Sequence, residues 1–209
     1  MKIDVHCLVH KEIKYFPILK RQMEKEDVNF FVINNGTNLG EGRIKGFTKG
    51  NSPYVSFVDY DDLVEPGIFN LIEKVLDSGY DWCYTDEMLI DKDGNYINPG
   101  WSSHPFLYHP YLLKFNKIGD NKYCHHILAF RRELITVEML YILKQLSEYT
   151  ISYIMGELSK HKNHYHIPCI GYYWRIHGDN AIFKSAAYKE LSKVAIEQGL
   201  MREGERRII

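Results

Sequence analysis

Apolar and polar residues along the first part of the chain follow the periods of strands that alternate with helices. Residues 3–9, IDVHCLV, predict a short strand, and apolar positions spaced as on one helix face follow up to about residue 25. Residues 27–34, DVNFFVIN, predict a second strand, so the chain opens with a β-α-β unit. The pattern therefore predicts an α/β fold with a mostly parallel central sheet.

The same periods predict the elements that follow a turn-rich loop, NNGTNLGEG. These are helical turns at 43–48, a buried strand at 54–58, a helix at 67–79, a strand at 80–84, helices at 133–160 and 185–198, and a strand at 169–175. A hairpin turn with Asp93-Gly94 at its tip is expected after the strand at 80–84. Because no internal repeat or low-complexity linker interrupts the chain, we expect residues 1–209 to form one domain.

Composition and charge exclude several classes of protein. With 45% hydrophobic and 25% charged residues, the chain has the balance of a globular protein rather than a disordered one. Its formal net charge of -1 gives no overall basic footprint for nucleic acid or anionic lipid. No apolar run approaches the roughly 20 residues of a membrane-spanning helix, and the first residues lack the apolar core of a signal peptide. We therefore expect a cytoplasmic protein with no integral membrane segment.

Three carboxylates directly follow the predicted strand at 54–58, in the tetrapeptide DYDD that begins at Asp59. Ligands of open α/β sheets bind outside the carboxyl ends of the strands, and this cluster occupies such an end. Adjacent carboxylates repel one another, and their hard oxygen atoms suit Mg2+ or Mn2+ shared with phosphates. The alternative is a solvated acidic loop in which Asp62 caps the next helix. The flanking strand and helix, together with Arg43 upstream, favour the metal and phosphate interpretation.

Several strings of the sequence resemble the family-2 glycosyltransferases of the GT-A type. GRIKGFTKGNSPYVSFVDYDDLVEPGIFNLI is similar to the family's arginine-bearing helix, its strand and D-x-D loop, and the helix after them. YDWCYTDEMLIDKDGNYINPGW, HHILAFRRELI and IPCIGYYWRIHGDN are similar to later segments of that family, in the same order. The resemblance implies a Rossmann-like GT-A sandwich. It divides the chain into a donor nucleotide and metal half at 1–100, an acceptor half at 101–180, and a helix and tail at 181–209.

By resemblance, the acidic loop binds a nucleotide-sugar donor through Mn2+ or Mg2+. Asp59 and Asp61 would hold the nucleoside and the metal-bound diphosphate, with Asp61 as a direct metal ligand. Arg43 would lie near the uracil or the phosphates, and His177 near the metal from the opposite side. Arg175 is either a further donor-binding residue or a structural partner for a buried carboxylate. A divalent cation and cationic donors of this kind stabilise the negative charge that gathers on the leaving diphosphate.

An inverting transfer also needs a carboxylate that takes the proton of the acceptor hydroxyl. The family supplies it from a Glu-Asp pair at the start of a helix, a place where this sequence has Ser147 and Glu148. Glu148 is therefore the candidate base. Asp86 competes with it, or binds the donor sugar instead.

Two departures from the family pattern bear on the donor. The second predicted strand ends in Asn34-Asn35-Gly36 where the family commonly has Asp-Asp-Gly, so amides rather than a carboxylate would contact the base. The link from there to Arg43 is also much shorter than usual, which makes this chain a minimal version of the fold. The donor is expected to be a UDP-sugar.

The acceptor is either a saccharide or a hydroxymethylated base in phage DNA, because compact sugar transferases of this general type decorate phage genomes. The basic residues that offer contacts to DNA phosphates are Arg131, Arg132, Arg202, Arg206 and Arg207. Two other functions stay open, a nucleotidyltransferase and a non-catalytic carbohydrate-binding protein. A nucleotidyltransferase normally needs a glycine-rich loop directly after the first strand. Here that place is taken by His10-Lys11-Glu12, which include no glycine.

Cysteines and histidines do not add a second metal site. The cysteines are scattered and include no Cys-x-x-Cys pair; they are Cys7, Cys83, Cys124 and Cys169. His161, His164 and His166 lack a Cys or carboxylate partner in the sequence, so we reject them as zinc ligands. His125 or His126 is expected to face the acceptor.

Overall fold

A computed structural model describes residues 2–9, 14–34, 38–99, 126–146 and 150–177. The strands are β1 (Ile3–Val9), β2 (Asn29–Asn34), β3 (Tyr54–Asp59), β4 (Leu63–Val64), β5 (Trp82–Ile90), β6 (Tyr96–Pro99), β7 (Leu128–Arg131) and β8 (His164–Arg175). The helices are α1 (Phe16–Met23), α2 (Leu39–Phe47), α3 (Ile68–Asp77), α5 (Val137–Gln145) and α6 (Thr150–Leu158). A 3-10 turn over Arg132–Leu134 follows β7. The helix expected at 185–198 lies outside the described residues.

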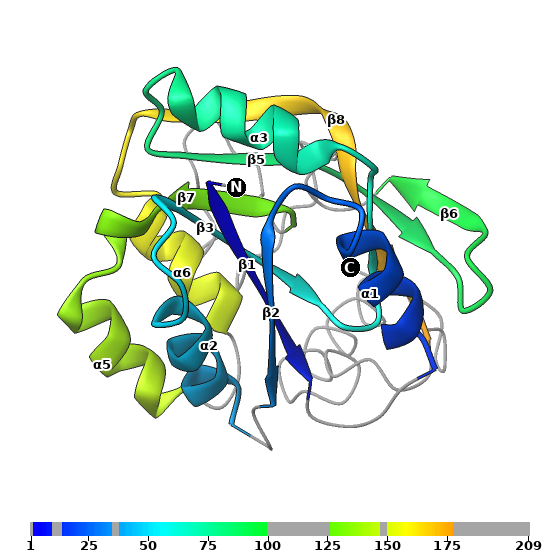
Figure 1. The fold of residues 1–209 in the computed structure, drawn as a ribbon, viewed down its shortest axis with the longest axis horizontal. Coiled ribbons are helices and arrows are strands. Elements are labelled where there is room, and N and C mark those ends of the chain that lie inside the picture. The colour runs from blue at the N-terminus through cyan, green and yellow to red at the C-terminus, as the bar shows by residue number, and fades with distance from the viewer. Residues whose placement is uncertain (1, 10–13, 35–37, 100–125, 147–149, 178–209) are drawn as a thin grey trace, which may run out of the picture.

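The strands form one mixed sheet in the order β2-β1-β3-β7-β5-β8-β4, with β6 paired to β5 (Figure 1). The α/β class and the parallel β2-β1-β3 unit are confirmed. The sheet is less parallel than expected, because β7 runs antiparallel between β3 and β5, and β4 runs antiparallel to β8. Hydrophobic pattern alone sets which face of a strand is buried, and not its direction, so the sequence did not reveal this reversal.

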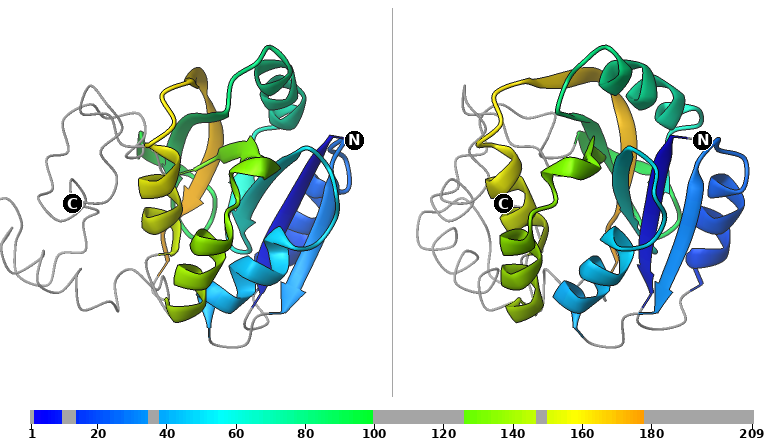
Figure 2. Two further views of the ribbon diagram at one scale, coloured as in Figure 1. Left: turned by 90° about the vertical axis from the view of Figure 1, so that its left-hand side faces the viewer. Right: turned by 60° about the vertical axis from the view of Figure 1, so that its left-hand side comes forward.

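Helices cover both faces of the sheet. Figure 2 shows α2, α5 and α6 together on one face, with α1 and α3 on the other. On β1 the alternate residues Ile3, Val5 and Cys7 join the core beneath α1 and α3. On β3 the residues Val55 and Phe57 point the other way and join the core beneath α2, α5 and α6. We call this second side of the sheet the α2 face.

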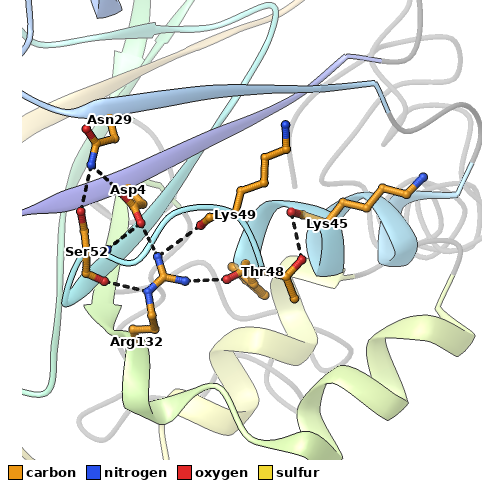
Figure 3. A network of polar contacts seen from close by, with 8 residues as sticks. Asp4, Asn29, Lys45, Thr48, Lys49, Ser52 and Arg132 are labelled. Carbon is orange, nitrogen blue, oxygen red and sulfur yellow. Dashed lines mark hydrogen bonds and ion pairs between the residues drawn. The ribbon is translucent and has the colours of Figure 1, made fainter.

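A polar network ties the amino ends of β1 and β2 to the turn before β3 and to the end of β7 (Figure 3). The buried Asp4 carboxylate accepts hydrogen bonds from the Asn29 amide over 2.8 Å and from the Ser52 N–H over 2.9 Å. The Arg132 guanidinium binds the same carboxylate and also donates to the carbonyls of Ser52 and Phe47. This network lies at the opposite end of the parallel strands from Asp59, so it stabilises the fold rather than forming part of a ligand site.

Among the helices that the structure describes, none is both long and apolar enough to cross a membrane.

Candidate active site

The carboxyl ends of β1, β2 and β3 meet at one edge of the sheet, because these strands are parallel and in register. Asp59 ends β3 opposite Leu8, and Asn34 ends β2 opposite Val9. Asn34 is exposed at this edge. The predicted donor residues Asn34 and Asp59 are thus brought together, while Asn35 lies outside the described residues.

The Asp59 carboxylate is held between the Arg43 guanidinium and the His126 imidazole on the α2 face. Arg43 Nη2 on α2 lies 3.1 Å from Asp59 Oδ1, and His126 Nε2 lies 3.4 Å from Oδ2. The Arg43 side chain is only 3% exposed, whereas that of Asp59 is 33% exposed. The Arg43 guanidinium also lies 4.2 Å from the centre of the Phe57 ring. The buried Arg43 side chain therefore orients the Asp59 carboxylate from the protein interior, and Asp59 is the member of the pair that reaches solvent.

Close approach of α2 to β1 makes the contact between Arg43 and Asp59 possible. The helix begins after Asn38, whose side chain accepts the Glu41 N–H over 2.9 Å. At Gly46 the helix meets the His6 ring so closely that a Cβ atom would lie 2.4 Å from a ring carbon. Gly46 thus sets the depth of α2, and with it the position of the Arg43 guanidinium.

Asp62 is the buried anchor of the acidic loop. Its Oδ1 accepts the Arg175 N–H over 2.7 Å, and its Oδ2 accepts the hydroxyl of Tyr172 over 2.8 Å. The Tyr172 oxygen in turn accepts the Asp59 N–H over 3.0 Å. Burial, with the nearby charges of Asp61 and Asp59, raises the pKa of Asp62 well above its ordinary value. The alternative role of Asp62 as a helix cap is wrong, because α3 begins after Gly67.

Asp61 and His177 meet at the rim of the same loop. His177 Nε2 lies 2.8 Å from Asp61 Oδ2, and both side chains are mostly buried. The Tyr15 ring, from the residue before α1, lies 5.4 Å from the His177 ring and 4.5 Å from the Arg175 guanidinium. Three segments that are far apart in the sequence therefore fix the orientation of this carboxylate and imidazole pair.

The Arg175 guanidinium is engaged by backbone carbonyls. Its Nε donates to Asp61 O over 2.9 Å, and its Nη1 donates to Asp91 O over 3.2 Å. Through these contacts the buried side chain joins the acidic loop to the hairpin after β5. This geometry agrees with a structural role, and the role of Arg175 in donor binding stays a prediction.

A carboxylate oxygen suits Mn2+ or Mg2+, an imidazole nitrogen is a common metal ligand, and here the two ligand atoms lie 2.8 Å apart. Within the described segments, no group of three or more His, Cys, Asp or Glu side chains is arranged to hold a metal. The donor set thus fits a cation that takes two protein ligands and fills its other positions with phosphate or water oxygens.

A second carboxylate and imidazole pair lies further along the α2 face. His166 Nε2 on β8 is 2.8 Å from Asp86 Oδ1 on β5, and the two side chains are 24% and 22% exposed. The competing base Asp86 is thus present on the sheet, while the candidate base Glu148 lies outside the described residues.

A protein-family model describes residues 17–137 of this chain, more than half of its length, as Glycosyl transferase family 2. The chain belongs to this family. It is therefore a glycosyltransferase that takes its sugar from a nucleotide-sugar. No curated protein sequence matches it.

Solved structures confirm the GT-A fold of this glycosyltransferase. Residues 1–349 of S. aureus TarS in complex with UDP-GlcNAc share 13% identity with it, at a TM-score of 0.62. That match covers 98% of this chain and 68% of the TarS fragment, and only 44% of the full TarS chain is covered. Glucosyl-3-phosphoglycerate synthase from Mycobacterium tuberculosis, in complex with Mn2+ and UDP, shares 12% identity at a TM-score of 0.60. Here 97% of this chain and 82% of the synthase are covered.

Arg131, which ends β7, and Arg132, which follows it, both serve the fold of the glycosyltransferase. Arg131 donates to the backbone carbonyls of Tyr80 and Leu76. Arg132 binds the Asp4 carboxylate and donates to the backbone carbonyls of Ser52 and Phe47. These contacts leave them little capacity for DNA phosphates. The other basic residues proposed for DNA, Arg202, Arg206 and Arg207, lie outside the described residues.

The sequence did not indicate the roles of four residues that shape the site: Tyr15, His126, His166 and Tyr172. For His126, what was missed is its contact with Asp59. The strand expected at 169–175 begins five residues earlier, at His164, where the alternating histidines are themselves a strand signal. Tyr172 gave no signal, since an aromatic residue in an apolar strand is ordinarily core.

Proposed function

We propose that this glycosyltransferase moves a sugar from a UDP-sugar to an acceptor hydroxyl, with Mn2+ or Mg2+ held by Asp61 and His177. The observation that carries the proposal is the 2.8 Å contact between Asp61 Oδ2 and His177 Nε2, at the sheet edge where Asp59 ends β3. The D-x-D loop thus presents one carboxylate beside an imidazole and another beside an arginine.

Each residue of this edge has a distinct part in the proposal. A bound cation would supply positive charge to the diphosphate as it leaves with the bonding electron pair. Asp61 would offer a carboxylate oxygen, and His177 would offer a ring nitrogen once the cation displaces the proton that this nitrogen donates to Asp61, while Tyr15 holds the imidazole plane. Because these side chains are already oriented, little reorganisation would accompany donor binding.

Asp59 would contact the nucleoside and count among the residues around the metal, and Arg43 would act mainly by fixing the Asp59 carboxylate. Asn34 and Asn35 would contact the base through amide groups. UDP is favoured because the similar TarS and glucosyl-3-phosphoglycerate synthase structures were determined with UDP or a UDP-sugar.

The acceptor hydroxyl would lose its proton to a carboxylate during an inverting displacement. Glu148 and Asp86 are the two candidates. For the acceptor itself, a saccharide is favoured over a hydroxymethylated base in phage DNA, because Arg131 and Arg132 are bound within the fold. The arginines of the tail keep the DNA hypothesis testable.

A donor screen tests the proposal. Purified protein is incubated with UDP-, GDP- and dTDP-sugars in Mn2+, in Mg2+ and in EDTA, and release of the nucleoside diphosphate is followed. We expect release from a UDP-sugar that EDTA abolishes. Asp93→Asn, in the exposed hairpin turn, is the matched control and should behave as wild type. If no donor releases a nucleoside diphosphate and calorimetry detects no binding of UDP, the proposed function is overturned.

The acceptor is tested with the donor found in that screen. Sugar incorporation is compared among duplex DNA with hydroxymethylated pyrimidines, unmodified duplex and simple glycans. Transfer to a neutral glycan should be nearly independent of salt, whereas transfer to DNA should fall steeply as salt rises. In the DNA case, Arg206→Ala should flatten the salt dependence.

A further inference from the structure

The Asp86 and His166 pair sits on the α2 face with a fixed geometry. His166 stacks on the Tyr84 ring, at 4.8 Å between ring centres and 12° between planes. Tyr84 is itself buried beneath α6 and packs against Trp82. A rigid aromatic floor therefore holds the imidazole edge toward Asp86, while both polar side chains keep part of their surface in solvent.

The same face connects this pair with the donor site in one row across the sheet. His126, just before β7, contacts Asp59 and packs edge-on against Phe57 at 5.8 Å. The pairing of β7 with β5 extends as far as Ile127, whose carbonyl accepts the Thr85 N–H over 3.2 Å. Continued by one residue, this register would set His126 opposite Asp86. The row therefore runs from Asp59 on β3, through His126, to the pair on β5 and β8.

Strand spacing gives the scale of this row. Neighbouring strands lie about 4.8 Å apart, so β3 and β5, with β7 between them, are separated by about 10 Å. The His126 side chain is fully buried, whereas those of Asp59 and Asp86 are 33% and 22% exposed, so a sugar ring whose diphosphate lies at the edge marked by Asp59 can extend toward Asp86 above this buried imidazole. The pair thus lies where the far side of a donor sugar and an incoming acceptor would meet.

We propose that Asp86 takes the proton of the acceptor hydroxyl and that His166 is the residue that positions it. The inference rests on the proposed function and makes the choice between the two candidate bases. The bond from the anomeric carbon to the diphosphate oxygen breaks, and its electron pair leaves on the diphosphate. The acceptor oxygen bonds to the same carbon, and its proton passes to Asp86.

The hydrogen bond between the two residues explains the need for His166. An ionised carboxylate only accepts hydrogen bonds, so the His166 Nε2 carries the proton and donates it to Oδ1. This bond fixes the rotamer of Asp86 and leaves Oδ2 for the acceptor. A carboxylate so oriented is ready for proton transfer, whereas one without the imidazole would rotate among several positions.

Substitutions at both residues separate this role from a structural one. Asp86→Asn removes the proton acceptor with little change in shape. His166→Gln keeps an N–H donor near the position of Nε2, and His166→Leu removes it. His164→Gln is the matched control, because His164 lies two residues earlier on the same strand and stacks on Trp82 rather than contacting Asp86.

The assay uses the UDP-sugar that wild type turns over fastest, with water as the acceptor, and follows UDP release. Calorimetry with UDP and Mn2+ and thermal unfolding are measured on the same samples. We expect Asp86→Asn to lower kcat by about 100-fold or more with UDP affinity within a factor of about 2. His166→Leu should lower kcat by about 10-fold or more, His166→Gln should restore most of it, and the control should match wild type.

The outcomes distinguish failure of the Asp86 and His166 pair from failure of the proposed function. Wild-type kcat in Asp86→Asn, or equal loss in His166→Leu and His166→Gln, would overturn the proposed pair and leave the donor site intact. Loss of turnover in Glu148→Gln with normal turnover in Asp86→Asn would assign the base to Glu148 instead. If wild type turns over no donor and binds no UDP, the proposed function fails, and the role of the pair fails with it.

Discussion

The hydroxyl of Tyr172 donates a hydrogen bond to the carboxylate of Asp62 over 2.8 Å, across 110 residues of sequence. The same oxygen accepts the Asp59 N–H, so one phenol on β8 holds both ends of the acidic tetrapeptide. Its ring also stacks on His126, with 4.5 Å between ring centres. Asp62 thus serves as an anchor for the loop that carries Asp59 and Asp61.

Removing this hydroxyl should loosen the loop. Tyr172→Phe deletes a buried hydrogen-bond partner of Asp62, which should cost about 1–3 kcal/mol in the free energy of unfolding. UDP affinity in Mn2+ should fall as well, because Asp59 and Asp61 lose their fixed spacing. Tyr173→Phe is the control, since its hydroxyl contacts Glu65 away from Asp59. Urea unfolding and calorimetry decide, and equal UDP affinity in the two variants would contradict the anchoring role.

Asp61 should be essential for the metal-dependent part of donor binding. Asp61→Asn retains the size of the side chain and removes its charge, so a divalent cation beside the diphosphate loses a ligand. We expect UDP affinity in Mn2+ to fall by about 100-fold or more and to become equal to that in EDTA. Calorimetry of UDP with and without Mn2+ measures both quantities. Wild-type affinity in Asp61→Asn would exclude this residue as the metal ligand.

His6 should make the fold sensitive to mild acid. Burial, with the neighbouring Arg43 charge, lowers the pKa of His6 well below its ordinary value of 6.5. The unfolded chain therefore binds a proton below about pH 6.5 that the folded protein does not bind. Stability is full above that pH and declines as pH falls, by at most about 1.4 kcal/mol per pH unit for this group.

Unfolding free energies measured between pH 8 and pH 5 test this effect. His6→Gln should show a shallower decline below pH 6.5 than wild type, whatever its stability at pH 8. His161→Gln, on the turn before β8, should retain the wild-type slope. The prediction fails when the slope of His6→Gln equals that of wild type.

Arg132 should matter for stability and not for the donor. Arg132→Met leaves the buried Asp4 carboxylate without its cationic partner, which should cost about 3 kcal/mol. Adding Asp4→Asn should restore part of that loss, because the remaining buried group is then neutral. UDP affinity in Mn2+ should stay unchanged in the folded fraction. A weakened affinity at wild-type stability would show that this network reaches the site.

Local sequence pattern predicted well the elements whose ends form the sheet edge at Asn34 and Asp59. The strand expected at 3–9 is β1 to the residue, and the acidic tetrapeptide does follow a buried strand. Residue types were enough for this, because the burial of β1 and β3 leaves a clear apolar signal. The contact of Arg43 with Asp59 also joins two residues that the sequence had assigned to one site.

Contacts that depend on β7 and β8 were beyond local pattern. Which side chain of β8 meets Asp62 depends on strand register, and a shift of one residue would turn Tyr172 to the other face. The direction of β7 likewise decides that His126, rather than Arg131, lies beside Asp59. Such facts are set by pairing between distant segments, which a single sequence does not display.

The insertion of β7 between β3 and β5 means that the sheet is completed only late in synthesis, because β7 follows both of these strands in the chain. The first 99 residues contain β1 to β6, yet β3 and β5 do not pair with each other and present open edges until β7 arrives. Tyr172 and His177 reach the acidic loop later still. Pairing of such distant segments is slow because a long stretch of chain must be closed first. A nascent chain whose D-x-D loop has already been synthesised therefore lacks the contacts that organise this loop, and they form only after β8 has been made.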